Sequence, residues 1–121
     1  MKELPNGVRV FNATPHVIRF WDPSWEWPVE VEPDVVVNAT PVETLVETWG
    51  MVEFVRTDFV CDEDGHDTIS RAFDEGADVV VGSIIAAQAY PGRVVAMTPA
   101  PGYERVAPSE KRMRPDKFTI F

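Results

Sequence analysis

Proline and glycine interrupt this chain at short intervals, and they limit what it can fold into. Among its 121 residues are 11 prolines and 7 glycines, spread along most of the sequence. Proline removes a backbone donor and glycine favours turns, so we expect short strands and short helices joined by tight turns. The length supports one domain over residues 1–121, large enough to bury a single core.

The first half of the chain has the pattern of strands. Apolar and polar residues alternate, which is typical of a strand with one buried face. Pro33 then marks the third of these segments as an edge strand or a bend. The expected strands are residues 8–11, 16–21 and 28–32, extended structure at 35–37, and a pair at 44–49 and 51–55 that flanks Gly50.

The second half adds two short helices. Asp67 or Thr68 can cap the first, and Gly76 is placed to end it. Its apolar face would consist of residues 69, 72 and 73. Ser83 can cap the second, at residues 84–90, which is apolar nearly all round and is expected in the core. The expected strands here are 78–81, 93–97 and 117–121, with the first buried on both faces and a loop at 98–110.

These elements predict an α+β fold. We expect a small single domain with a mainly antiparallel sheet of about seven short strands and two short helices.

Charge is distributed unevenly. The net charge is −9, so binding to duplex nucleic acid is not expected. Residues 1–90 carry −12, whereas residues 91–121 carry +3. This basic segment either covers the acidic body or forms a local anion site with Arg105, Arg112 and Arg114. Many acids and only three lysines also suit a salt-rich cytoplasm, which leaves a halophilic source open.

Several classes of protein are excluded or disfavoured. No apolar run approaches the roughly 20 residues of a membrane span, and the first residues have no signal-peptide pattern, so we expect a cytoplasmic protein without a membrane. Cys61 is the only cysteine, which excludes an internal disulfide. P-loop and GxSxG patterns are absent from the sequence.

The acidic stretch after Cys61 is the next candidate for chemistry. Asp62, Asp64, His66 and Asp67 lie close together but do not satisfy a calcium-loop pattern, so a solvated loop without metal is expected. Only residues 66–68 fit the His-x-Thr/Ser motif that two-histidine phosphoesterases carry twice, so that class is rejected. We expect no catalytic residue and no cofactor, although His16 or His66 with Asp carboxylates could serve a hydrolase.

Four polar positions could contact a ligand. Asn12, Thr14 and His16 lie around Pro15 and either stabilise a turn or form the polar rim of a site. Ser83 follows a strand and a glycine, where it either caps a helix or binds phosphate.

Tryptophan is frequent, with four residues in the chain. Trp25 and Trp27 would share one face in an extended segment. They could pack in the core or at a subunit interface, or stack on a base.

Residues 11–16, 80–89 and 93–97 together resemble a family of small phage and prophage proteins. Members open with Asn-x-Thr-Pro-His, as residues 12–16 do here, and carry a central Val-Val-Ser-x-Leu-Val-Ala-x-Ala stretch. This chain departs from the pattern with Trp25 in place of glycine, an extra Gly82, and an acidic insert around residues 62–67. The resemblance implies a viral or prophage origin.

Small phage proteins of this kind often counter host defence, and one class sequesters immune signals. That origin, together with the aromatic residues, the clustered arginines and the lack of a catalytic motif, suggests a protein that binds a cyclic nucleotide or a cyclic ADP-ribose derivative in the host cytoplasm without cleaving it. Exposed tryptophan would also favour a homo-oligomer. The alternatives are an acidic nucleic-acid mimic that inhibits a host defence enzyme, and a nucleotide hydrolase. The residues expected at the ligand are Asn12, Thr14, His16, Trp25, Trp27, Ser83, Arg105, Arg112 and Arg114.

Overall fold

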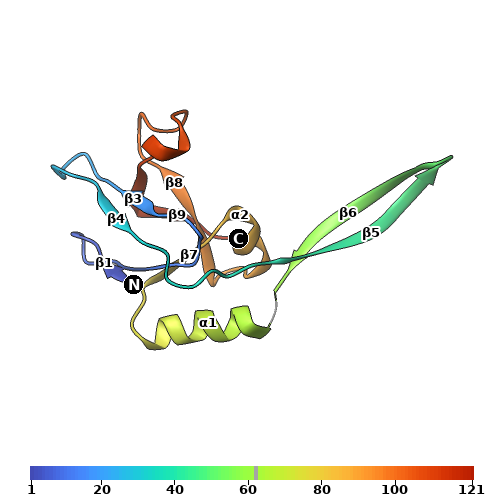
Figure 1. Ribbon diagram of the computed structural model, residues 1–121, viewed down its shortest axis with the longest axis horizontal. Helices are drawn as coiled ribbons and strands as arrows, with labels where there is room; N and C mark the ends of the chain where they lie inside the picture. Colours follow the sequence, from blue (N-terminus) through green and yellow to red (C-terminus); the bar gives the residue numbers. More distant parts are fainter. Residues whose placement is uncertain (62) are drawn as a thin grey trace.

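Seven strands form one mixed sheet, and two further strands form a separate hairpin (Figure 1). The structure, a computed structural model, describes residues 1–61 and 63–121. Its predominance of strands, with two α-helices and a short 3-10 helix, confirms the expected α+β fold. In chain order the elements are β1 (Lys2–Glu3), β2 (Arg9–Asn12), β3 (Ile18–Phe20), β4 (Val29–Val31), β5 (Thr40–Trp49), β6 (Val52–Val60), α1 (Glu63–Asp74), β7 (Val79–Val81), α2 (Ile84–Ala89), β8 (Val94–Pro99), η1 (Pro108–Glu110) and β9 (Met113–Thr119).

The strand order of the main sheet is β1-β2-β7-β8-β9-β3-β4. β1–β2, β8–β9 and β3–β4 are antiparallel, as is the hairpin β5–β6. β2, β7 and β8 run parallel, and so do β3 and β9. Antiparallel pairs thus form the majority of the pairs described. The sequence did not indicate the parallel group. Within it, β7, α2 and β8 form a strand–helix–strand crossover, which allows β7 and β8 to run parallel.

The sheet separates two clusters of buried side chains. Both helices cover the first cluster, which includes Phe11, Ile69 and Tyr90. The second cluster includes Phe20 and faces the other way. Neighbouring residues of β7 enter different clusters and are fully buried, which confirms that this strand is covered on both faces.

Several strand boundaries differ from the prediction. β1 was not predicted, because two polar residues carry no alternating pattern. Residues 35–37, expected as extended structure, lie outside the assigned strands. β9 begins at Met113, four residues before the expected start. β5 begins at Thr40, four residues before its expected start, and β6 ends at Val60, five residues after its expected end. Pairing with a neighbouring strand extends these elements beyond their own sequence signal.

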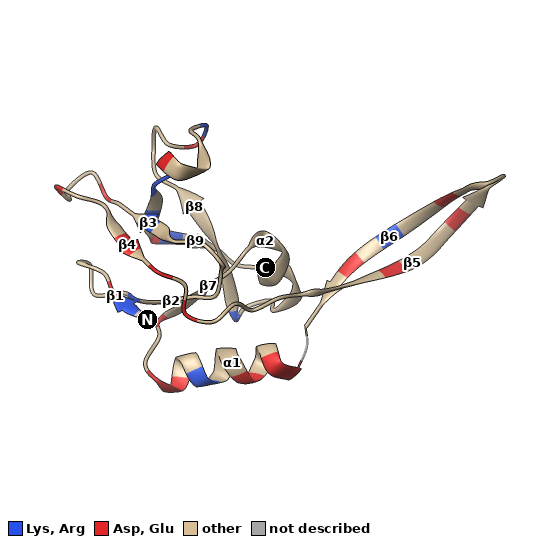
Figure 2. Cartoon of the chain, in the orientation of Figure 1, with Lys and Arg blue, Asp and Glu red and all other residues tan. Residues whose placement is uncertain are grey.

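Helix α1 starts earlier than predicted. It begins at Glu63, so Asp67 and Thr68 lie within the helix and do not cap it. Glu63 and Asp64 occupy its first turn, where the helix dipole favours negative charge (Figure 2). The predicted solvated loop is thus partly helical, and its Asp62 lies outside the described residues.

The end of α1 follows the prediction. Gly76 has a φ of +102° and its N–H donates to the carbonyl of Phe73, while the N–H of Ala77 donates to that of Ala72. These two bonds satisfy the last carbonyls of the helix, a role that glycine fills because it adopts positive φ without strain. The predicted apolar face is only partly correct: Ile69 and Ala72 are buried, but Phe73 is 38% exposed.

Helix α2 begins as predicted but is not fully enclosed. The Ser83 hydroxyl oxygen accepts a hydrogen bond from the Ala86 N–H at 3.1 Å, which confirms it as the N-cap. Ala86 and Ala87 are buried, whereas Ile84 and Ile85 remain exposed. The prediction of a core helix therefore holds for one face only.

Gly82 lies where β7 meets α2, and the packing there leaves no room for a side chain. A Cβ atom at this position would lie 2.6 Å from Cγ1 of Val94 and 3.2 Å from Cβ of Ala86. We therefore expect Gly82→Ala to lower the free energy of unfolding by about 1–3 kcal/mol, because the strand and helix must move apart. Urea denaturation checks this. Wild-type stability in the variant would contradict the packing described.

The hairpin β5–β6 projects away from the main sheet, and we call residues 40–60 the arm (Figure 1). A two-residue turn, Gly50 and Met51, joins its strands. Gly50 has a φ of +60°, as a tight turn with glycine in its first position requires. Every residue of β5 is exposed.

Candidate functional site

Parallel pairing of β2 with β7 brings two predicted motifs together. Asn12 pairs with Val81, so the two strands end at the same edge of the sheet. The segments that follow, which contain Thr14 and His16 in one case and Ser83 in the other, therefore lie near each other. Ligands commonly bind beyond the carboxyl ends of parallel strands.

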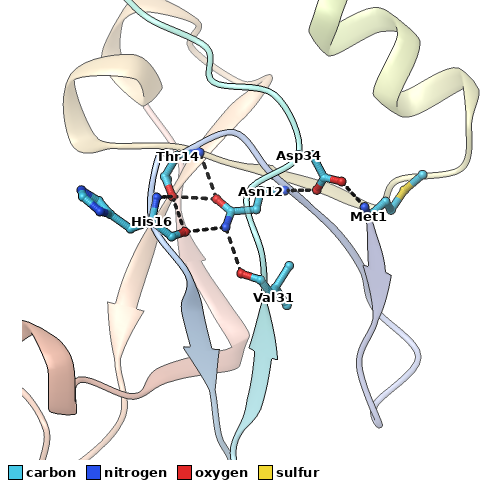
Figure 3. A network of polar contacts seen from close by, with 6 residues as sticks. All are labelled: Met1, Asn12, Thr14, His16, Val31 and Asp34. Carbon is cyan, nitrogen blue, oxygen red and sulfur yellow. Dashed lines mark hydrogen bonds and ion pairs between the residues drawn. The ribbon is translucent and has the colours of Figure 1, made fainter.

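The side chain of Asn12 stabilises the backbone at this edge of the sheet. Its side-chain oxygen accepts hydrogen bonds from the Thr14 N–H at 2.9 Å and the Thr14 hydroxyl at 2.7 Å. Its amide donates to the carbonyls of His16 at 2.8 Å and Val31 at 3.0 Å (Figure 3). Asn12 is 0% exposed, so all of its hydrogen-bonding capacity is used within the protein. The structure thus gives Asn12 the turn-stabilising role, and does not place it at a ligand.

Asp34 ties the next segment to the same network. Its carboxylate accepts a hydrogen bond from the Asn12 N–H at 2.9 Å and pairs with the amino group of Met1 (Figure 3). Its own N–H donates to the Asn12 carbonyl at 2.9 Å. These contacts fix the turn that carries His16, whose imidazole points away from the network (Figure 3).

A pocket of about 620 Å³ opens beside this turn, within the size range of small-molecule sites. Its walls come from the turn after β2, from β3, β8, η1 and the start of β9. The lining residues are Thr14, Pro15, His16, Val17, Ile18, Arg19, Ser83, Met97, Pro108, Ser109, Lys111 and Met113.

The charged side chains that line the pocket are cations. They are Arg19 and Lys111, with His16 as a third ionisable group, and no carboxylate is among the described lining residues. Arg19 is oriented by Glu30, whose carboxylate accepts from its Nε at 3.0 Å, and by the carbonyl of Ser109. This arrangement suits an anionic ligand with an apolar part, since half of the lining is apolar.

The positive pocket contrasts with a second hollow at the edge of the sheet. That hollow, of about 430 Å³, is lined by Lys2 and by three carboxylates, those of Glu30, Glu32 and Asp34. Excess negative charge disfavours phosphate there. The pocket at the end of β2 and β7 is therefore the better anion site.

The predicted arginines do not line the pocket. The guanidinium of Arg112 lies 4.9 Å from the ring centres of both Trp21 and Tyr103, a cation–π arrangement. Arg114 donates two hydrogen bonds to Asp116, each 3.0 Å long, which holds the pKa of that carboxyl below its usual value. Arg105 is exposed.

The predicted indoles are also elsewhere. Trp25 packs against the second core cluster, and its carbonyl accepts from the Trp21 indole N–H at 3.1 Å. Trp27 is 73% exposed. The segment between β3 and β4 turns at Asp22, whose carbonyl accepts from the Trp25 N–H, so the two indoles do not share an extended face. One arginine of the basic segment, Arg112, does contact an indole, but it is the indole of Trp21.

Cys61 and His66 form a polar cluster that the sequence pattern did not reveal. His66 Nε2 lies 3.0 Å from Cys61 Sγ, and its Nδ1 lies 3.1 Å from Arg93 Nη1. Because arginine can only donate, Nδ1 accepts, so Nε2 carries the ring proton and donates to the sulfur. A histidine in this state does not take a proton from the thiol, so the cluster lacks the arrangement of an activated nucleophile.

No group of three metal-ligating side chains is found among the described residues. Nor is any described helix long and apolar enough to cross a membrane.

Of the nine predicted ligand residues, the pocket gathers Thr14, His16 and Ser83. It adds Arg19 and Lys111, which were not predicted. These two residues come together through the parallel pair β3–β9, which joins segments more than ninety residues apart in the sequence.

Comparisons of the chain with family models, with curated proteins and with solved structures found no match.

Proposed function

We propose that this protein binds and sequesters a nucleotide second messenger of host immunity, without cleaving it. It would act in the host cytoplasm as a small counter-defence protein of a virus or prophage. The proposed ligand is a cyclic nucleotide or a cyclic ADP-ribose derivative, held in the pocket between the ends of β2 and β7 and the start of β9.

The charge of the pocket carries this proposal. In a chain with a net charge of −9, the charged residues that line this pocket of about 620 Å³ are Arg19 and Lys111. Cations concentrated in a concave site of an acidic protein favour an anion with charge-assisted hydrogen bonds. The ligand phosphates would contact Lys111 first, beside Arg19, which also pairs with Glu30, and Ser83 and His16 would lie at the rim.

The apolar part of the pocket supports a nucleotide over a simple phosphate. Ile18, Met97 and Met113 line it together with the cations. Thioether and aliphatic side chains provide a surface for a base or a ribose, which inorganic phosphate would leave uncovered.

Sequestration is favoured over hydrolysis by the chemistry of the lining residues. His16 is near Ser83 in the pocket, but Ser83 already accepts the Ala86 N–H as a helix cap. The described lining has no carboxylate to orient His16 as a base. The pocket therefore has groups that bind phosphate and lacks a recognisable set that activates water.

The test is calorimetric titration with ADP-ribose, cyclic ADP-ribose and cyclic dinucleotides, followed by heat release and chromatography of the bound compound. We expect saturable binding of at least one of these, with the compound recovered unchanged. Altered product would support the hydrolase alternative. Failure to bind any of them, together with displacement of DNA from a defence nuclease, would favour the acidic mimic and overturn the proposal.

A further inference from the structure

The arm exposes far more apolar surface than its own two strands can cover. It contributes half of the exposed large apolar residues in the described chain. An isolated two-stranded hairpin is marginally stable in water, and exposed apolar patches commonly mark interfaces. The residues are Val42, Leu45, Val46, Trp49, Met51, Val52, Phe54, Val55 and Val60.

The two edges of the arm differ in their capacity to accept another strand. β5 contains Pro41, which cannot donate, and a register shift between Leu45 and Glu47. Both features obstruct edge-to-edge pairing. β6 has neither proline nor glycine, and on its outer side it pairs with no described strand. The edge open to a further strand is therefore that of β6, although at its base this strand contacts α2 and Phe59 packs against the first core cluster.

The sequence of β6 is complementary to itself when read in the opposite direction. Residues 54–60 are Phe-Val-Arg-Thr-Asp-Phe-Val. We consider a second copy of β6 that runs antiparallel, with Thr57 opposite Thr57. Phe54 then lies opposite Val60, Val55 opposite Phe59, and Arg56 opposite Asp58, and symmetry repeats each pair. Apolar pairs, opposite charges and paired threonines directly across a ladder all stabilise a sheet.

The charges select this register over its neighbours. The two copies would be related by a two-fold axis perpendicular to the sheet. The register can therefore change only in steps that leave the side chains of opposite residues on the same face of the sheet. The next register in one direction puts Arg56 opposite Arg56, and the next in the other puts Asp58 opposite Asp58. Like charges directly opposite destabilise a pair. The sequence is therefore matched to one alignment of two copies.

The register within the arm extends this match across four strands. Leu45 pairs with Val55 in one arm, and Pro41 pairs with Phe59. With Val55 opposite Phe59 of the second copy, these residues form an apolar row across all four strands on one face. The tip of each arm then lies beside the base of the other.

We propose that two copies of this chain form a symmetric dimer through their arms. β6 of each copy pairs antiparallel with β6 of the other about Thr57, which creates a four-stranded sheet in the order β5-β6-β6-β5. This interface is independent of the ligand proposed for the pocket, so each can fail without the other.

Charge exchange at the interface tests the proposal. Arg56→Asp places Asp opposite Asp58 twice, and Asp58→Arg places Arg opposite Arg56 twice. We expect each single variant to raise the dimer dissociation constant about 10- to 100-fold, measured by sedimentation equilibrium. The double variant R56D/D58R restores opposite charges and should regain the wild-type constant. Glu53→Arg, outside the self-complementary segment of the same strand, is the matched control and should leave it unchanged.

Disulfide cross-linking tests the register of the β6–β6 pair separately. In a Cys61→Ser background, Thr57→Cys should cross-link the dimer on oxidation, because residues directly opposite in a ladder have Cα atoms close enough for a disulfide. Thr44→Cys on β5 should not. A monomeric wild-type protein, single variants that dimerise normally, or a dimer that Thr57→Cys fails to cross-link would each overturn the proposal. Circular dichroism confirms that every variant is folded.

Discussion

Reversing the charge of Lys111 should weaken binding of the phosphorylated ligand about 100-fold, because it removes a charge-assisted hydrogen bond and adds repulsion. Lys111 is half-buried, lines the pocket and forms no ion pair within the described residues. Its charge is therefore available to an anion. Calorimetric titration of Lys111→Glu with the tightest ligand measures the loss.

Lys117→Glu is the matched control for this variant. Lys117 lies in β9, the strand that follows Lys111 in the chain, is exposed, and is not among the residues that line the pocket. The substitution changes the net charge of the protein by the same amount, so it reports the general electrostatic effect of charge reversal. Equal losses for the two variants would show that the pocket does not hold the phosphate.

Asn12→Ala should cause the largest loss of stability among single substitutions in the turn after β2. It removes the side-chain oxygen that accepts from the Thr14 N–H and hydroxyl, and the amide group that donates to the carbonyls of His16 and Val31. Unsatisfied buried groups are costly, so we expect a loss of about 3–5 kcal/mol in the free energy of unfolding. The melting temperature should fall by about 10 °C or more, measured by calorimetry.

Asn6→Ala is the comparison for this prediction. Asn6 also makes two hydrogen bonds, to the Pro115 carbonyl and from the Val8 N–H, but its side chain is exposed and water can replace it at the Val8 N–H. We expect a loss of about 1 kcal/mol or less. If Asn12→Ala is no more destabilising than Asn6→Ala, the buried network does not hold the turn as described.

The sequence predicted the features that depend on neighbouring residues. Ser83 as a helix cap and Gly76 as a helix end are confirmed because each acts on backbone groups within a few residues. The buried strand β7 is confirmed because three consecutive valines leave no polar face. The start of α1 was wrong because acidic residues extend the helix through favourable interaction with its dipole.

The pocket could not be predicted fully, because it depends on long-range pairing. Phe20 pairs with Met113, and this contact brings Arg19 and Lys111 to one cavity. No local pattern marks such a pair. Counting arginines and indoles in the sequence suggested Arg112 and Arg114 instead, but their partners in the fold, Trp21 and Asp116, determine where they point.

The position of the ligand is tested most directly by amide chemical shifts in an NMR titration with the tightest compound of the nucleotide panel. Binding in the proposed pocket predicts shifts concentrated at His16, Ser83, Ser109 and Lys111, while the arm and the exposed face of α1 remain unchanged. Shifts centred on Arg105, Trp27 or the arm, or no shifts with any compound of the panel, would contradict it.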